Sequence, residues 1–252
     1  MSREVLQVVA AGGFAVIAVA AAWRLRLGLS RDLAYAAVRA AAQLAAVGAL
    51  ITLVFEVEPL AFAFVAAMVL TAALTSGGRL NVVPHARRRV AVAIGVPALA
   101  AVGLLLLIGA FAATPRAAVP AAGILIGGAM TAATITGRRL LEALEEQEGE
   151  IEARLSLGDD AQTALRPILR RAVTTGLGPV IDQTRSVGLV TLPGTFVGLV
   201  LGGASPAAAA RVQLLVLLAL LAVELFSALI VGRLLLAAVV APGERVVVPA
   251  RA

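Results

Sequence analysis

Long apolar runs follow one another along most of this chain, and they constrain its fold more than any other feature. Five of them cover residues 5–22, 33–55, 60–76, 90–112 and 117–137. About 20 apolar residues are enough to cross the hydrocarbon core of a bilayer as a helix. Two further runs, 172–203 and 208–236, follow a polar segment. With 61% hydrophobic residues and a mean hydropathy of +1.00, the sequence predicts an all-α, polytopic transmembrane helical bundle of about seven spans, forming a single domain over residues 1–252.

The arginines indicate how this bundle is oriented. All 21 basic residues are Arg and the net charge is +6, which in a soluble protein would suggest nucleic acid as a partner. Here the arginines lie between apolar spans, where they set orientation. The segments assigned to the inside hold sixteen: Arg24, Arg26, Arg31, Arg79, Arg87, Arg88, Arg89, Arg138, Arg139, Arg154, Arg166, Arg170, Arg171, Arg233, Arg245 and Arg251. The outer segments hold Arg3, Arg116 and Arg211. We expect the N-terminus outside, the C-terminus inside, and a multi-pass protein in the plasma membrane of a prokaryote, surrounded by lipid and without a nucleic-acid partner.

The longest polar segment, about residues 138–171, is predicted to form an amphipathic cytoplasmic arm between spans five and six. Its apolar residues fall near one helical face: Leu141, Leu144, Ile151 and Leu155. Glutamates cover most of the remaining surface. Glu150 and Arg154 have the i,i+4 spacing of a stabilising ion pair.

The arm is expected to contain two helices. Gly158 should end the first one, because glycine adopts the left-handed conformation found after helix C-termini. Asp159 or Asp160 should cap a second, short helix that runs toward Pro167. A helix, a glycine turn and a short helix could dock in a groove of a soluble partner. The alternative is a solvated extension with no partner.

A resemblance to known permeases bears on this choice. Glu152-Ala153-Arg154, three residues, Gly158, nine residues and Ile168 resemble the EAA-type loop of ABC-transporter permeases. The wider runs are similar to the FetB/YbbM-type permease family: VRAAAQL from residue 38, GGAMTAAT, EARLSLG, PVIDQTRSVGLVTLPG and SPAAAARVQL. Arg154 stands where the EAA pattern has alanine, and Gly128 where the family pattern has asparagine.

This resemblance implies a function for the arm. The chain would be the membrane subunit of an ABC transporter, with Glu152, Ala153, Gly158 and Ile168 coupling it to a separate ATPase subunit that binds ATP and Mg. It also implies a homodimer and export of iron or another metal ion, although the residues themselves fit a hydrated or chelated cation or another small solute equally well. The chain itself has no Lys, so it lacks the P-loop of an ATPase, and we expect it to bind no cofactor of its own.

The sixth span is predicted to be broken, because Pro179, Pro193 and Gly194 interrupt it. A short helix at the inner surface would carry Asp182 and Arg185, whose i,i+3 pair is either structural or part of a gate. Broken helices in membranes are tolerated where freed backbone groups face protein or a cavity. We therefore place Leu192, Pro193 and Gly194 in the translocation path.

Two charged residues fall within predicted spans. Arg39 shares a helical face with Gln43 and could snorkel to the interface, line the path or lie at a subunit contact. Glu224 lies deep in the last span, where a carboxylate is a functional hypothesis by default. It could pair with Arg39 or stay protonated.

Small residues recur at four-residue spacing in two spans. Gly123 and Gly127 form a GxxxG pattern, and Gly194, Gly198 and Gly202 repeat along one face. Such faces allow close helix packing, either within the chain or across a dimer seam.

Other function classes find little support. The chain has no Cys and a single His, His85, so thiolate and multi-histidine metal sites are excluded within one chain, and metal ligands stay undefined. An intramembrane hydrolase would need a Ser/His pair, two aspartates or a metal cluster. An autonomous channel or secondary transporter is the main alternative, although it would leave the arm unexplained.

Overall fold

The computed structural model describes residues 2–243 and 245–247, which form two compact units divided after Glu58. Arg251 lies outside the described residues. The first unit holds two helices packed on each other, α1 (Arg3–Arg24) and α2 (Ser30–Glu56). Both are apolar along most of their length, and nearly all of their side chains are exposed. In a membrane protein this surface faces lipid or other protein rather than water.

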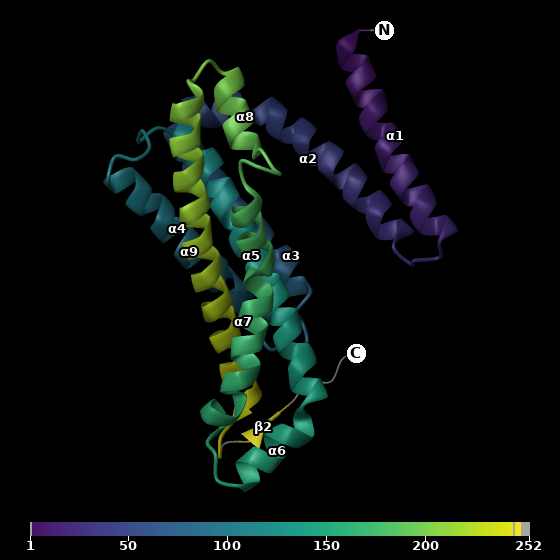
Figure 1. Ribbon diagram of the computed structural model, residues 1–252, viewed down its shortest axis with the longest axis vertical. Helices are drawn as coiled ribbons and strands as arrows, with labels where there is room; N and C mark the ends of the chain where they lie inside the picture. The colour runs from purple at the N-terminus through teal and green to yellow at the C-terminus, as the bar shows by residue number, and fades with distance from the viewer. Residues whose placement is uncertain (1, 244, 248–252) are drawn as a thin grey trace. The chain divides into compact units, whose positions relative to one another are not determined.

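The second unit is an elongated helical bundle with a small hairpin at the C-terminal end of its last helix (Figure 1). Its helices are α3 (Glu58–Gly78), α4 (Ala86–Leu107), α5 (Pro115–Glu146), α6 (Glu148–Ser156), α7 (Ala161–Ser186), α8 (Gly194–Leu201) and α9 (Pro206–Val239). Two short antiparallel strands follow, β1 (Val240–Ala241) and β2 (Arg245–Val246), with Val240 opposite Val246 and Ala241 opposite Arg245.

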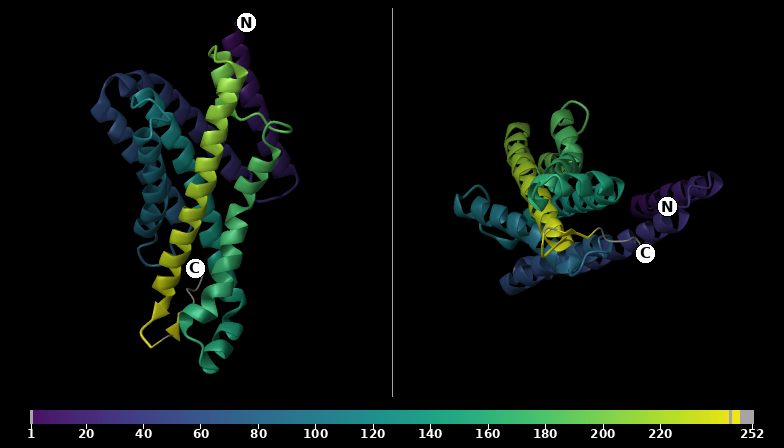
Figure 2. Two further views of the ribbon diagram at one scale, coloured as in Figure 1. Left: turned by 60° about the vertical axis from the view of Figure 1, so that its left-hand side comes forward. Right: turned by 90° about the horizontal axis from the view of Figure 1, so that it is seen from below.

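The helices α5, α7 and α9 form the centre of this unit, and α4 packs on α5 and α9. In the left view of Figure 2, α7 and α9 lie side by side along much of their length. Small residues allow the close approach. A Cβ at Gly176 of α7 would collide with the Thr136 hydroxyl of α5, and one at Gly232 of α9 would collide with Leu169 of α7. The buried side chains between these helices are mainly Ala, Val and Leu.

Six helices in the described chain are long and apolar enough to cross a membrane: α1, α2, α3, α4, α5 and α9. The 26-residue α7 carries five charged residues and is not among them. It nevertheless runs back along α5 and α9, and 26 residues extend about 39 Å. The fold therefore confirms an all-α, polytopic helical membrane protein with six candidate spans in its described part, and a seventh crossing through α7 stays a prediction.

The predicted sixth span is wrong in its details. Asp182 and Arg185 do not lie on a separate short helix at the inner surface, because α7 continues through Pro167 and Pro179 to Ser186. A proline inside a helix costs about 3 kcal/mol or more, but here one face of α7 is buried along most of the helix. That burial holds the helix together, and the chain breaks only after Ser186, before the eight-residue α8.

The arm also differs from its prediction in extent. Residues 117–137 were expected as one span, but α5 continues for 32 residues to Glu146, so the span and the first part of the arm are one helix. The predicted helix terminator and ion pair are confirmed: Gly158 has φ +98°, and Arg154 Nε lies 3.4 Å from Glu150 Oε1. Of the two possible caps, Asp160 is the one that accepts a hydrogen bond, from the Thr163 N–H at 2.6 Å.

Candidate functional site

The arm lies at one end of the bundle, where α5 ends, α6 crosses and α7 begins (Figure 1). Its inner face is apolar and buried. Leu144 of α5, Ile151 of α6 and Leu165 of α7 are each at most 2% exposed and belong to the main hydrophobic core. Burying a side chain of this size stabilises the fold by about 1.5–3 kcal/mol. The arm is therefore packed onto the bundle as a structured element.

The outer face of the arm is acidic, with one large apolar residue at its tip. Glu152 and Ala153 are exposed, as the coupling prediction requires. Leu157 is 87% exposed and immediately precedes Gly158. Sequence reasoning did not single out Leu157. The sequence feature that could have identified Leu157 is an apolar residue at the C-cap of a short acidic helix. No further turn of that helix follows to cover its side chain.

Ile168 occupies a different environment from the other predicted coupling residues. It is 3% exposed and packs within the main core. A direct contact between Ile168 and a soluble partner is therefore incompatible with this structure. Any role of Ile168 in coupling would therefore be indirect and stays a prediction.

Asp160 fixes the start of α7. The Thr163 backbone N–H, and then the Thr163 hydroxyl, hold the pKa of the Asp160 carboxyl below its ordinary value. The carboxylate also interacts favourably with the positive end of the helix dipole. The junction between the arm and α7 is thus set by Gly158, which ends one helix, and by Asp160, which begins the next.

The bundle interior contains a second feature, a buried polar face on α9. Gln213, Glu224 and Ser227 are all at most 6% exposed, and their spacing of 11 and 3 residues places them on one side of a helix. On α5, Thr136 is also fully buried, next to Gly232 of α9 and Gly176 of α7. Among the described residues, Thr136 Oγ1, Gln213 Oε1, Glu224 Oε2 and Ser227 Oγ have no hydrogen-bond partner.

Gly128 makes room for Glu224. A Cβ on Gly128 would lie 2.6 Å from Glu224 Oε1 and would also meet Leu220. Gly128 is the position at which the resemblance expected asparagine. The structure gives a physical reason for glycine here, because any side chain on this part of α5 would displace the carboxylate of α9.

A hydroxyl pair joins α3 to α5. Thr134 Oγ1 donates to the Met130 carbonyl at 2.7 Å, so Ser76 Oγ, 2.5 Å away, donates to Thr134. Sequence reasoning missed this pair and most of the polar face on α9. A single polar residue within a run of Leu and Ala does not indicate a buried polar face until the helices that pack against it are known.

Of the residues predicted for the translocation path or a gate, Glu224 lies on this polar face, whereas Leu192, Pro193 and Gly194 lie elsewhere. Leu192 and Gly194 are exposed, and Pro193 is half-buried, at the segment between α7 and α8. Asp182 and Arg185 are exposed near the end of α7, and no ion pair joins them in the described structure. Their role in a gate stays a prediction without that pair.

The other predicted residues are distributed as follows. Gly123 lies against the Met68 side chain of α3, where an added Cβ would be 2.8 Å from its Cε atom, so its close contact is within the chain. Gly127 and Gly198 have open space beside them, and Gly202 meets only carbonyls of α8. Arg39 and Gln43 lie on α2 in the first unit, so a pair between Arg39 and Glu224 stays a prediction.

A metal centre of the usual kind is absent from the described part of the chain, where no three His, Cys, Asp or Glu side chains come together. Among the described residues, Glu224 is the one buried acidic side chain that a cation inside the bundle could meet. Hydroxyl and amide oxygens would have to complete the coordination. Such all-oxygen sets suit hard cations.

Comparisons with known proteins place this arrangement in a family. UPF0014 membrane protein STAR2 of Oryza sativa subsp. japonica is 36% identical over 84% of this chain and 75% of its own length. Protein ALUMINUM SENSITIVE 3 of Arabidopsis thaliana is 32% identical over 80% and 75%. Probable iron export permease protein FetB of Escherichia coli (strain K12) is 29% identical over 85% and 84%. No solved structure matches the chain. The profile of the uncharacterised protein family UPF0014 matches residues 5–240, and the chain belongs to this family of membrane proteins.

Proposed function

We propose that this chain is the membrane-spanning permease subunit of an ABC transporter in a prokaryotic plasma membrane. Its arm would dock on a separate ATPase subunit, which binds ATP and Mg. The observation that carries this proposal is the continuity of the arm with the bundle. The exposed tip at Leu157 and Gly158 joins α6 to α7, while α5 enters the arm without a break.

This continuity gives a mechanical route from the arm to the interior. The 32 residues of α5 extend about 48 Å, from the outer end of the bundle to the arm. Gly128 on α5 contacts Glu224, and Thr136 contacts Gly176 of α7. Because packed helices move as rigid elements with few intermediate arrangements, a displacement at the tip would change the packing around Glu224.

A homodimer follows from the same proposal. Each chain carries one arm, and an ABC transporter uses two ATPase subunits. The glycine faces at Gly127 and at Gly198 have open space within this chain. They are the surfaces at which a second copy could approach closely.

For the substrate we propose a metal cation, with iron export the leading assignment. The name of the Escherichia coli relative supports it, and so does the buried Glu224 carboxylate. Glu224 Oε2 and Ser227 Oγ lack partners among the described residues, and unpaired buried polar groups are costly unless a ligand, a proton or water satisfies them. Glu224 is the residue we expect a cation to meet within the bundle.

The proposal is tested by expressing the chain together with a candidate ABC ATPase subunit from the same organism. Leu157→Asp places a charge on the exposed tip of the arm. Leu189→Asp makes the same change at a residue that is 94% exposed in the segment after α7. We expect Leu157→Asp to abolish co-purification and permease-stimulated ATP hydrolysis, and Leu189→Asp to leave both intact. Equal behaviour of the two variants would overturn the assignment of the arm as the docking element.

An autonomous cation transporter is the second candidate, and the observation in its favour is the buried carboxylate of Glu224. Intramembrane carboxylates commonly serve in proton or ion relays. Purified chain in liposomes distinguishes the two proposals. Cation flux without ATPase that is lost in Glu224→Gln supports the autonomous transporter. Flux that requires both ATPase and ATP supports the ABC permease.

A further inference from the structure

A cavity lined by arginines lies between α5 and α7, away from the buried polar face. Its volume is about 870 Å³, and its lining residues are Arg139, Arg166, Pro167, Arg170, Arg171, Thr174 and Thr175. Four guanidinium groups thus border one space. We call this space the arginine cavity. Neither the proposed docking of an ATPase nor the proposed cation path uses it.

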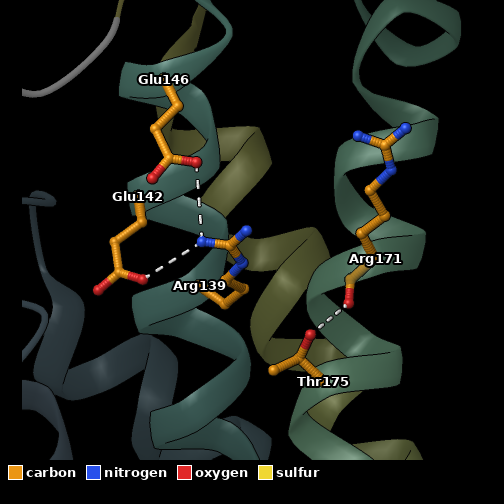
Figure 3. A network of polar contacts seen from close by, with 5 residues as sticks. All are labelled: Arg139, Glu142, Glu146, Arg171 and Thr175. Carbon is orange, nitrogen blue, oxygen red and sulfur yellow. Dashed lines mark hydrogen bonds and ion pairs between the residues drawn. The ribbon is translucent and has the colours of Figure 1, made fainter.

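The charges around this cavity are incompletely balanced. Arg139 Nη1 lies 3.7 Å from a carboxylate oxygen of Glu142 and 3.7 Å from one of Glu146, both on its own helix (Figure 3). Those distances are longer than a charge-assisted hydrogen bond. In the described part of the chain, Arg166, Arg170 and Arg171 form no ion pair. The cavity therefore carries excess positive charge.

The donors that face the cavity are mainly guanidinium groups. The Thr174 hydroxyl donates to the Arg170 carbonyl at 2.9 Å, and the Thr175 hydroxyl donates to the Arg171 carbonyl at 3.0 Å. Figure 3 shows the second of these bonds, with the Arg171 side chain extending from α7 away from Thr175. Because both hydroxyl hydrogens are used within α7, recognition in the cavity depends on the arginines. Planar guanidinium groups match the oxygens of a phosphate in bidentate fashion.

The position of the cavity, next to the apolar parts of α5 and α7, indicates which kind of anion could reach it. Arg139 follows directly after the apolar part of α5, and the apolar part of α7 begins directly after Arg171. This is the level at which the headgroups of the inner leaflet lie. Arg170 is ten residues beyond Asp160, which is about 15 Å along a helix from the start of α7. The cavity is thus set back from the tip of the arm.

We propose that the arginine cavity binds a phosphate-bearing anion, and that in the membrane this anion is the headgroup of an anionic phospholipid. The phosphate would lie between α5 and α7, the two helices that carry the arm. A bound headgroup, with its single negative phosphate charge, would offset part of this excess positive charge and bridge the bases of these helices. It would therefore stabilise the arm against the bundle, whatever substrate the chain transports and whether or not an ATPase docks there.

The test compares the full-length chain in nanodiscs of phosphatidylcholine with the same chain in nanodiscs that also contain phosphatidylglycerol. The variant is Arg170→Gln/Arg171→Gln. The control is Arg79→Gln/Arg88→Gln, which removes two exposed arginines assigned to the same side of the membrane but outside the cavity. A guanidinium that donates charge-assisted hydrogen bonds to a phosphate contributes at least about fivefold in affinity, whereas an exposed arginine outside the cavity adds only a screened attraction to the surface. We expect the cavity variant to retain phosphatidylglycerol about 30-fold less well by native mass spectrometry, and the control to match the unmodified chain.

Thermal unfolding in the same nanodiscs gives an independent readout. Phosphatidylglycerol should raise the unfolding midpoint of the unmodified chain and of the control, but not that of the cavity variant. Arg170→Lys/Arg171→Lys should recover part of the shift, since lysine keeps the charge but loses the bidentate geometry. Equal lipid retention by cavity variant and control would overturn the site. A full shift from inorganic phosphate in phosphatidylcholine nanodiscs, at constant ionic strength, would overturn the lipid as the source of the phosphate.

Discussion

The two ends of α7 differ in how firmly the chain holds them. At the arm end, Asp160 caps the helix, Leu165 and Ile168 are buried, and Gly158 gives a sharp turn from α6. At the other end, no capping side chain is found at Val187, and the chain continues through a turn with Gly188 at φ +85°. The helix that follows, α8, has no buried residue.

This difference in packing means that the two ends of α7 would respond differently to an applied force. The arm end is packed and capped, so a force applied to its tip would reach the bundle. The α8 end has few contacts with the interior of this chain and is covered mainly by α9. Segments with few buried contacts open at low cost in free energy. Under the proposed function, the arm end of α7 would transmit movement and the α8 end would adapt to it.

The largest expected effect lies between the two ends, at Gly176. A side chain at this position would meet the Thr136 hydroxyl, and its Cβ would lie 3.1 Å from the Ala132 carbonyl oxygen. We expect Gly176→Val to destabilise the chain by about 1–3 kcal/mol or more through overpacking. Gly178→Val is the control, because nothing lies within 4 Å of a Cβ there. The measurement is the thermal unfolding midpoint in detergent, and a similar midpoint for both variants would contradict the close packing of α5 and α7.

The sequence correctly predicted features that depend on residues close together in the chain. Apolar runs located the six long apolar helices, and the boundaries at Gly158 and Asp160 were correct, because a left-handed glycine and a capping carboxylate act within a few residues. Ser205 likewise caps α9, since its hydroxyl accepts from the Ala208 N–H at 3.3 Å. These signals need no knowledge of the rest of the fold.

The missed features depend on neighbouring helices. Pro167 and Pro179 indicated breaks, but packing against α5 and α9 keeps α7 continuous. The cluster of arginines was interpreted as orientation alone, because only the structure brings Arg139 beside the α7 arginines. The same holds for Glu224, whose contact with Gly128 joins residues almost one hundred positions apart.

Two glycines with positive φ allow the two ends of α7 to be compared by the same substitution. Gly158 has φ +98° and Gly188 has φ +85°, with open space beside both. Alanine at either position should cost about 1–2 kcal/mol of local strain. We expect Gly158→Ala to lower permease-stimulated ATP hydrolysis severalfold, because it reorients the tip of the arm. Gly188→Ala should leave that activity close to normal. The reverse pattern would assign transmission to the α8 end.

The smallest effect is expected at Asp160, and it depends on pH. Hydrogen bonds from Thr163 keep the pKa of Asp160 below its ordinary value. A carboxyl with a lowered pKa in the folded state contributes stability above its unfolded pKa, and loses it as the pH falls through the folded value. We therefore expect Asp160→Asn to lower the unfolding midpoint slightly at neutral pH, with the difference from the unmodified chain disappearing at acid pH. Asp159→Asn, which changes the neighbouring carboxyl that does not cap α7, should show no such convergence. Because the cap lies at the junction of arm and bundle, a pH dependence of ATP hydrolysis that follows the same profile would show that the start of α7 must stay helical for the arm to act.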